Sequence, residues 1–175
     1  DWADWLYAEH VFVVADFAED IAKRYGASVD LCRAAAVLHD VADASMSRFD
    51  PNHEQASLDI ARMLLQEFGL SKEEIGIIVD DAIKLHSCRD GQKPKSIVGE
   101  ALSTADALAH LTTNFYQFAT ENMMSDMPKE KRILWVTKKL PRDFNDKIAF
   151  DEIREEVRPN YQKLVIQFEA QDLSV

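Results

Sequence analysis

Residues 31–43 (LCRAAAVLHDVAD) read as a helix that is apolar on nearly every side and ends in adjacent polar residues, His39 and Asp40. Its three consecutive alanines are good helix formers, and their small side chains let neighbouring helices approach closely. A helix that is apolar all round is buried at the centre of a fold. A carboxylate buried at its end needs a cation or several donors, and the histidine beside it suggests a metal ion.

Helical patterns continue along the rest of the chain. Apolar residues at helical spacing predict helices over about residues 2–25, 51–68, 72–86 and 97–113, followed by amphipathic helices over about 121–168. Gly26 and Gly69 are stop signals, while Ser71 and Ser96 are capping residues. Turns are expected near residues 125–128 and 141–145, and Pro159 should kink or restart the last helix.

No segment reads as a strand or a repeat, so the predicted fold class is all-α, a helical bundle around a central buried helix. A chain of 175 residues with 47% hydrophobic content is long enough for one well-buried core. We expect a single domain over residues 1–175. Its motif-bearing core spans about 5–120, and further C-terminal helices span about 121–175.

Composition restricts the partners. The net charge of −11 would repel a nucleic-acid polymer, whereas a small phosphorylated substrate can still bind where a divalent ion reverses the local charge. No run of about 18 apolar residues exists, so no membrane partner is expected. Cys32 and Cys88 lie far apart, which favours reduced thiols and a cytoplasmic location. Whether the chain forms a homodimer is left open.

Polar residues recur on the apolar faces of five predicted helices. A lone inward histidine is more often a hydrogen-bonded core residue than a ligand. Several unrelated buried imidazoles and carboxylates would each need a separate partner, whereas convergence on one metal centre satisfies all of them. The residues on these faces are His10, His39, His53, His86 and Asp106, and the segment 31–43 adds Asp40.

The order His10, His39-Asp40, Asp106 on separate helices resembles the HD superfamily of metal-dependent phosphohydrolases, which is named for that doublet. The contexts Leu-His-Asp-Val and Ala-Asp-Ala-Leu are similar to the family's motifs, and the resemblance covers about residues 5–120. It implies that these four residues ligate one divalent ion. Two nitrogens and two oxygens suit Mn, Fe, Ni, Co or Zn.

His53 and His86 correspond in order to extra histidines of HD subgroups that hold two metal ions, in which Asp40 would bridge the ions. By this resemblance the site holds one or two ions. The alternative is that His53 and His86 bind substrate phosphate or another anion. His110, one helical turn after Asp106, is expected to be structural.

The predicted function is hydrolysis of a phosphoester or phosphoanhydride in a small phosphorylated substrate, a nucleotide first among them, by metal-activated water. Asp40 would act mainly as a ligand and Asp43 as a general base. The basic residues Lys84, Arg89 and Lys93 would bind substrate phosphates, with a solvated surface role as the alternative.

Two other function classes remain open. One is a non-catalytic HD-type binding or regulatory module, although none of its four expected ligands is missing here. The other is a redox enzyme with a di-iron centre, like the HD-type oxygenases. No second histidine follows His53 at zinc-protease spacing, no Glu-x-x-His occurs, and the chain has no glycine-rich phosphate loop.

Overall fold

The computed structural model describes residues 5–172, with side chains to residue 170, and within this range it is helical without a strand, so the all-α prediction is confirmed. A continuous N-terminal helix includes the π-helical η1 (Tyr7–Val11) and α2 (Phe12–Tyr25). The other elements are α3 (Val29–Leu38), η2 (Val41–Ala44), α4 (His53–Glu67), α5 (Lys72–Ile75) with η3 (Gly76–Ile83), η4 (Arg89–Gly91), α6 (Ile97–Thr112), α7 (Phe115–Phe118) with η5 (Ala119–Met123), α8 (Lys129–Arg142) with η6 (Asp143–Lys147), and α9 (Asp151–Asp172).

Local sequence signals set several helix ends. Gly26 ends α2 with φ 74°, a left-handed conformation that glycine adopts without a steric penalty. Ser71 and Glu74 form the predicted capping box at α5. The side chain of Ser96 accepts a hydrogen bond from the Gly99 N–H at the start of α6. The first predicted helix began at about residue 2, and residues 2–4 lie outside the described range.

The turn predicted at residues 141–145 is wrong, because α8 runs through Pro141 and continues as η6 to Lys147. Pro141 cannot donate a backbone hydrogen bond, which costs about 3 kcal/mol in a helix interior. Val136, Leu140 and Phe144 are nevertheless buried in the shared core, and this packing outweighs the cost. In the same way α9 continues through Pro159 and does not restart there.

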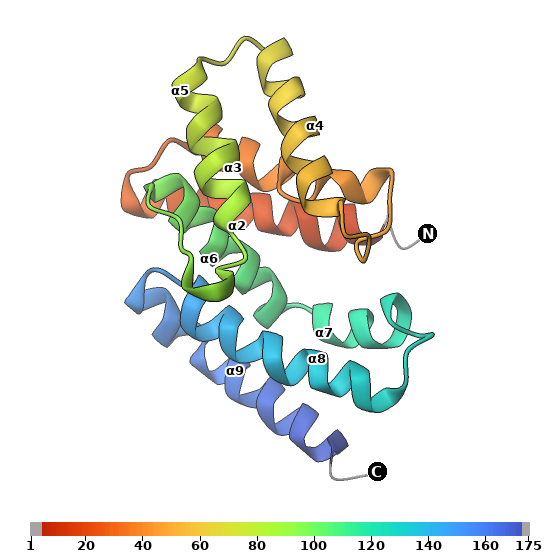
Figure 1. Cartoon of the computed structure of the whole chain (residues 1–175). Helices are drawn as coiled ribbons and strands as arrows, with labels where there is room; N and C mark the ends of the chain where they lie inside the picture. Colours follow the sequence, from red (N-terminus) through yellow and green to blue (C-terminus); the bar gives the residue numbers. More distant parts are fainter. Residues whose placement is uncertain (1–4, 173–175) are drawn as a thin grey trace.

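The central helix of the bundle is α6 (Figure 1), in which every residue from 101 to 111 is buried. Helices α2 and α3 with η3 contact it on one side, and η6 and α9 contact it on the other. The predicted bundle around a buried helix is therefore confirmed, but the sequence placed residues 31–43 at its centre. In α3 only Cys32, Ala35 and Ala36 are fully buried, because this helix packs in the layer outside α6.

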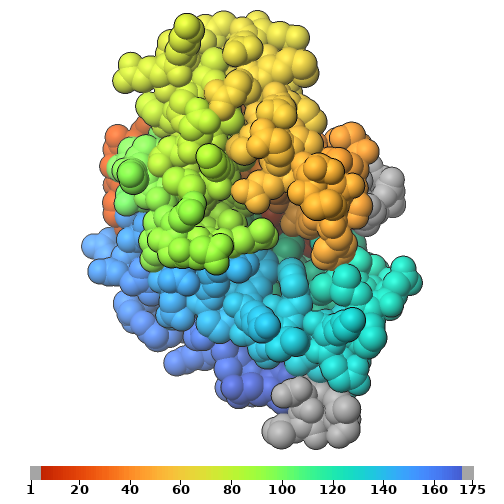
Figure 2. All heavy atoms as spheres, viewed as in Figure 1, coloured from red at the N-terminus to blue at the C-terminus, as the bar shows by residue number. Residues whose placement is uncertain are grey.

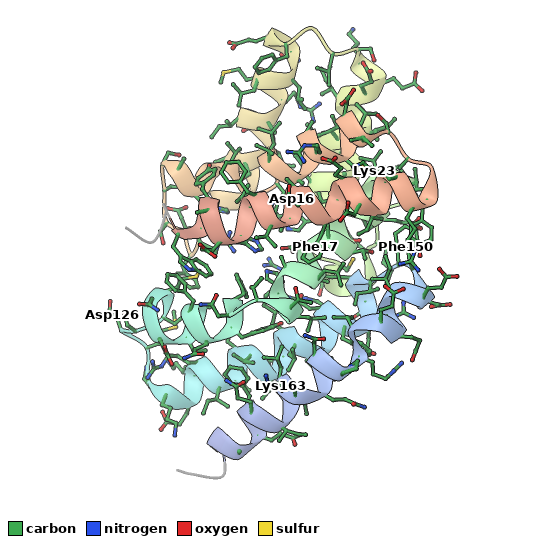
Figure 3. All side chains as sticks on the ribbon, turned by 180° about the vertical axis from the view of Figure 1, so that it is seen from behind. Asp16, Phe17, Lys23, Asp126, Phe150 and Lys163 are labelled. Carbon is green, nitrogen blue, oxygen red and sulfur yellow. The ribbon has the colours of Figure 1, made fainter. Side chains whose placement is uncertain are left out.

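The side of α2 that faces away from the core carries charged side chains. Figure 3 shows the molecule from behind, where α2 and α9 are seen at full length, with Asp16 and Lys23 on the exposed side of α2. One apolar core joins residues from α2 through α9. Among residues 5–172, no helix combines the length and apolar character that crossing a lipid bilayer requires.

Candidate metal centre

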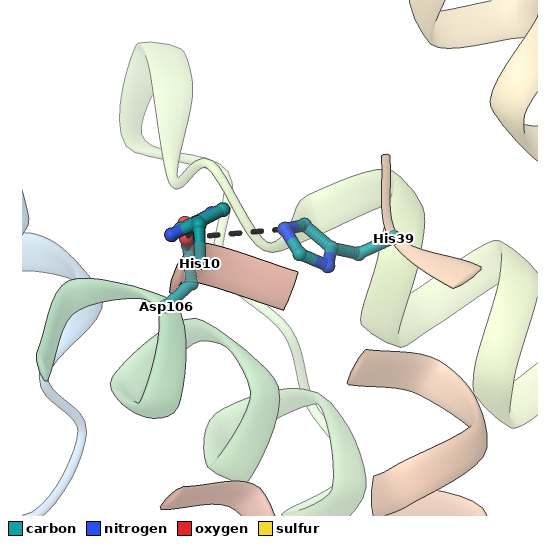
Figure 4. Close-up of side chains that lie close together, drawn as sticks. All are labelled: His10, His39 and Asp106. Atoms are coloured by element: carbon teal, nitrogen blue, oxygen red, sulfur yellow. Dashed lines mark ion pairs between the residues drawn. The ribbon is translucent and has the colours of Figure 1, made fainter. Parts of the chain in front are cut away.

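Three distant parts of the chain bring His10, His39 and Asp106 together (Figure 4). His10 comes from η1, His39 follows the last residue of α3, and Asp106 lies in the middle of α6. His10 Nε2 and His39 Nε2 lie 3.2 and 3.9 Å from Asp106 Oδ1, and all three residues are buried. One potential ligand atom from each residue lies within 4.8 Å of the other two.

A second group shares His39 with the first. Potential ligand atoms of His39, Asp40 and His86 also lie within 4.8 Å of one another, and Asp40 Oδ2 is 3.3 Å from His39 Nε2. Both Asp40 and Asp106 approach the same atom, His39 Nε2, so His39 belongs to both groups. The five residues offer ligands for one ion or for two neighbouring ions.

Backbone hydrogen bonds fix the orientation of two of these imidazoles. His39 Nδ1 is 2.6 Å from the Ala36 carbonyl oxygen, and His86 Nδ1 is 2.6 Å from the Ile83 carbonyl oxygen. A carbonyl can only accept, so each Nδ1 carries the hydrogen and donates it. Each Nε2 then presents a lone pair, as a metal-binding histidine does when its other nitrogen is held in this way.

Three buried atoms of the first group have no hydrogen-bond partner among the described residues. His10 Nε2, His39 Nε2 and Asp106 Oδ1 are all unsatisfied among the described residues, and the short His10–Asp106 contact lacks hydrogen-bond geometry. Leaving one buried polar atom unpaired costs about 1–3 kcal/mol. A divalent cation would satisfy all three atoms at once, and imidazole nitrogens with carboxylate oxygens suit a transition-metal ion. His10, His39 and Asp106 therefore fit the divalent metal ion that the resemblance to the HD superfamily implies.

Asp106 also belongs to a buried network from the C-terminal helices. Lys147 donates to Asp106 Oδ2 and lies 3.7 Å from Asp143 Oδ1, while His110 contacts Asp106 at 3.2 Å and Asp143 at 2.9 Å. Burial alone would raise the pKa of Asp106, but His110 and Lys147 hold it well below its ordinary value. Burial lowers the pKa of His110 to about 3. Because its pKa is lowered, the Asp106 carboxylate is ionised at neutral pH, as a metal ligand must be.

Arg48 holds the second ionised carboxylate. Its guanidinium donates to Asp40 and Asp43. Burial alone would raise the pKa of Asp40, but the charge of Arg48 and contact with His39 keep it well below its ordinary value. Asp40 is thus charged as well as close to His39 and His86.

His53 and Asp43 form a separate pair, with His53 Nε2 2.8 Å from Asp43 Oδ1. His53 belongs to neither group of potential metal ligands. Asp43 is buried, does not line the adjacent cavity, and binds Arg48 through both of its oxygens. Its role as a general base stays a prediction, whereas its contacts are those of a residue that positions Arg48 and His53.

A cavity of about 260 Å³ opens beside these residues. On the face shown in Figure 2, the orange segment around residues 40–54, the yellow-green segment around 83–89 and the blue segment around 139–147 meet at this site. The lining includes His39, Asp40, His86 and Asp106. Five cations also line it, although the whole chain is acidic: Arg48, Arg89, Lys139, Arg142 and Lys147.

Only one of the three predicted substrate-binding residues lines the cavity in the structure. Arg89 lines the cavity. Lys84 is exposed and does not line it, and Lys93 is exposed and lies 3.7 Å from Asp146. A phosphate in the cavity would therefore contact Arg89, while Lys84 and Lys93 have the positions of solvated surface residues.

Five charged residues of the site were not predicted from the sequence: Arg48, Arg142, Lys139, Asp143 and Lys147. The last three are spaced four residues apart, which places them on one face of a helix. This signal was readable, but the turn predicted at residues 141–145 divided it. Arg48 lies in a polar loop, where the pattern gives no indication that its side chain turns inward.

Comparisons with known proteins show the fold and the family of this chain. The crystal structure of a protein from an uncultured Thermotogales bacterium, described as a predicted HD superfamily hydrolase, is similar with a TM-score of 0.59 and 20% sequence identity, covering 95% of this chain and 79% of the other. At this identity the likeness shows the fold alone. The search of curated proteins finds no match. The family model of the HD domain matches residues 7–111, which is more than half of the chain and includes His10, the His39-Asp40 doublet and Asp106, so the chain belongs to the HD-domain family.

Proposed function

We propose that this protein is a metal-dependent phosphohydrolase that cleaves a phosphoester or phosphoanhydride in a small phosphorylated substrate, with nucleotides as the first candidates. One observation carries the proposal. The unpartnered ligand atoms of His39 and Asp106 belong to residues that line a cavity with five cationic side chains. Ligands for a divalent ion beside cations for an anion are the two requirements of metal-dependent phosphoryl transfer.

His10, His39 and Asp106 would hold one ion, and Asp40 and His86 offer ligands for a second, because the single Nε2 lone pair of His39 can bind only one ion. When bound, a divalent ion supplies Lewis acidity toward water and toward the phosphoryl oxygens. The ligand atoms of these five residues come from four separate parts of the chain, so folding fixes their relative positions before substrate arrives.

The cations of the chain act on the substrate. Arg48 and Lys147 are held by Asp40 and Asp106, so their charges lie beside the ligand groups, where phosphoryl oxygens would bind. Arg89 stands at the rim, 3.9 Å from Glu54, with its side chain largely exposed. These cations favour an anionic substrate, which supports hydrolysis over the redox and purely regulatory alternatives.

The proposal is tested by removing and restoring metal. The purified chain, stripped with a chelator and reloaded in turn with Mn, Fe, Ni, Co or Zn, should hydrolyse p-nitrophenyl phosphate or a nucleoside phosphate only in a reloaded form. Asp106→Asn should lose bound metal and activity together, because it removes a charged ligand. Lys84→Ala, which changes an exposed residue outside the cavity, is the matched control. Full activity in the stripped protein would contradict the proposal.

A further inference from the structure

We propose that α8 adds a second anion subsite to the cavity, formed by Arg142 and Lys139, which binds a phosphate adjacent to the one that is hydrolysed. This inference rests on the proposed function and narrows its substrate class to compounds with a diphosphate group. The two residues lie beyond residues 7–111, where the HD-domain model matches, so the subsite belongs to the C-terminal helices of this chain.

Arg142 differs from the other cations of the cavity. Arg48 binds Asp40 and Asp43, Lys147 binds Asp106, and Arg89 faces Glu54. Arg142 lines the cavity but forms no ion pair or hydrogen bond with any described residue, and its buried Nε has no partner. A partly buried guanidinium without an acceptor is costly, and a phosphate group would satisfy its donors bidentately.

Lys139 stands beside Arg142, because residues three apart in a helix share a face. Its Nζ is 3.2 Å from Asp143 Oδ1, and it also lies over the Phe115 ring, 5.8 Å from the centroid. Burial lowers the pKa of Lys139 to about 8, which leaves it mainly charged at neutral pH. Two cations from one helix therefore line the same cavity.

The subsite adjoins the metal centre through Asp143. Lys147, which donates to Asp106, and Lys139 both contact the Oδ1 atom of Asp143, at 3.7 and 3.2 Å. The ammonium groups of Lys139 and Lys147 are therefore no farther apart than the sum of these two distances. A ligand that contacts both ammonium groups needs two anionic groups close together. The two phosphates of a phosphoanhydride, joined through one oxygen, meet this need, whereas phosphates at opposite ends of a sugar do not.

Titration calorimetry of the Mn-loaded full chain tests the subsite, with methylenediphosphonate and inorganic phosphate as probes. The wild type should bind the diphosphonate at least about tenfold more tightly than phosphate. Arg142→Ala should remove most of that difference, about tenfold for the loss of a charged hydrogen-bonding partner, and leave phosphate binding within about twofold. Arg142→Lys should retain part of it. Lys138→Ala, an exposed neighbour outside the cavity, should change neither affinity.

Other results would overturn the proposed subsite or the proposed function. Equal wild-type affinity for the two probes, or an equal loss of both in Arg142→Ala, would overturn the second subsite. Binding of adenosine 3′,5′-bisphosphate as tight as that of ADP, and lost in the same variant, would overturn the adjacency of the two phosphates. A wild-type chain that retains Mn and hydrolyses p-nitrophenyl phosphate while failing these tests keeps the proposed function. A chain that neither retains Mn nor hydrolyses any phosphate defeats the proposed function itself.

Discussion

Two carboxylates of the site, the half-buried Asp40 and the buried Asp106, are each held by a cation, Asp40 by Arg48 and Asp106 by Lys147. Removing one partner of a buried ion pair is strongly destabilising, because the other charge stays buried without compensation. Burial would lower the pKa of Lys147, but Asp106 and Asp143 raise it above the ordinary value. Lys147 is therefore a charged structural partner of the metal-free site.

Lys147→Met should lower the free energy of unfolding of the metal-free protein by about 3–5 kcal/mol, the cost of breaking a buried ion pair. The loss should be smaller in the Mn-loaded protein, because the ion then compensates Asp106. Urea unfolding with chelator and with excess Mn measures both values, and Lys138→Met is the exposed control. Equal losses in the two conditions would mean that Asp106 does not share its charge with a metal ion.

At the scale of elements, the site depends on where α6 begins. Ser96 caps this helix, and Asp81 of η3 accepts hydrogen bonds from the Ser96 N–H and Oγ. Gly99 lies in the first turn, where a Cβ atom would come within 2.4 Å of Pro94 Cβ and 2.8 Å of Asp81 Oδ2. The close approach of the 88–96 loop to α6 therefore requires glycine at this position.

Gly99→Ala should destabilise the protein by about 1–3 kcal/mol, as overpacking does, and lower the midpoint of thermal unfolding. Gly76→Ala is the matched substitution, because Gly76 is helical and a Cβ atom added there would have no neighbouring side chain or loop within 4 Å. That variant should be stabilised by about 0.4–1 kcal/mol, since alanine loses less backbone entropy on folding. A neutral Gly99→Ala would show that the loop does not pack on α6 as described.

The elements also show what local sequence can and cannot predict. Gly26, the Ser71–Glu74 box and Ser96 act within one helical turn, so their effects were readable. The course of α8 through Pro141 depends on core contacts made with distant helices, which no local pattern contains. For the same reason the histidines and aspartates that face inward could be predicted, while their division into a His10–His39–Asp106 group, a His39–Asp40–His86 group and an Asp43–His53 pair could not.

At the scale of the whole molecule, the buried histidines make the metal-free fold sensitive to acid. Burial lowers the pKa of His10, lowers that of His86 to about 4 and lowers that of His110 to about 3. Below the ordinary value of about 6.5 the unfolded chain takes up protons that these folded imidazoles do not. Burial also opposes protonation of His39, but Asp40 raises its pKa, so its stabilising contribution is complete below about 6.5 and does not offset the loss.

The free energy of unfolding of the metal-free protein should therefore fall between pH 7 and pH 5. The expected slope is about 1.4 kcal/mol per pH unit for each such histidine, since the unfolded chain binds more protons. Urea titrations at several pH values measure it, and His110→Asn should reduce the slope by about one histidine's share. A stability that does not change over this range would show that these imidazoles are not buried in the neutral form.

If His10, His39 and Asp106 together hold a divalent ion, anomalous diffraction from crystals grown with Mn should locate it. We expect a strong anomalous peak among His10 Nε2, His39 Nε2 and Asp106 Oδ1, three buried atoms that lack a hydrogen-bond partner in the described chain. A second peak beside Asp40 and His86 would indicate a two-ion centre. Absence of any peak at the first position, in crystals where Mn is bound elsewhere or not at all, would show that these three residues do not hold a divalent ion.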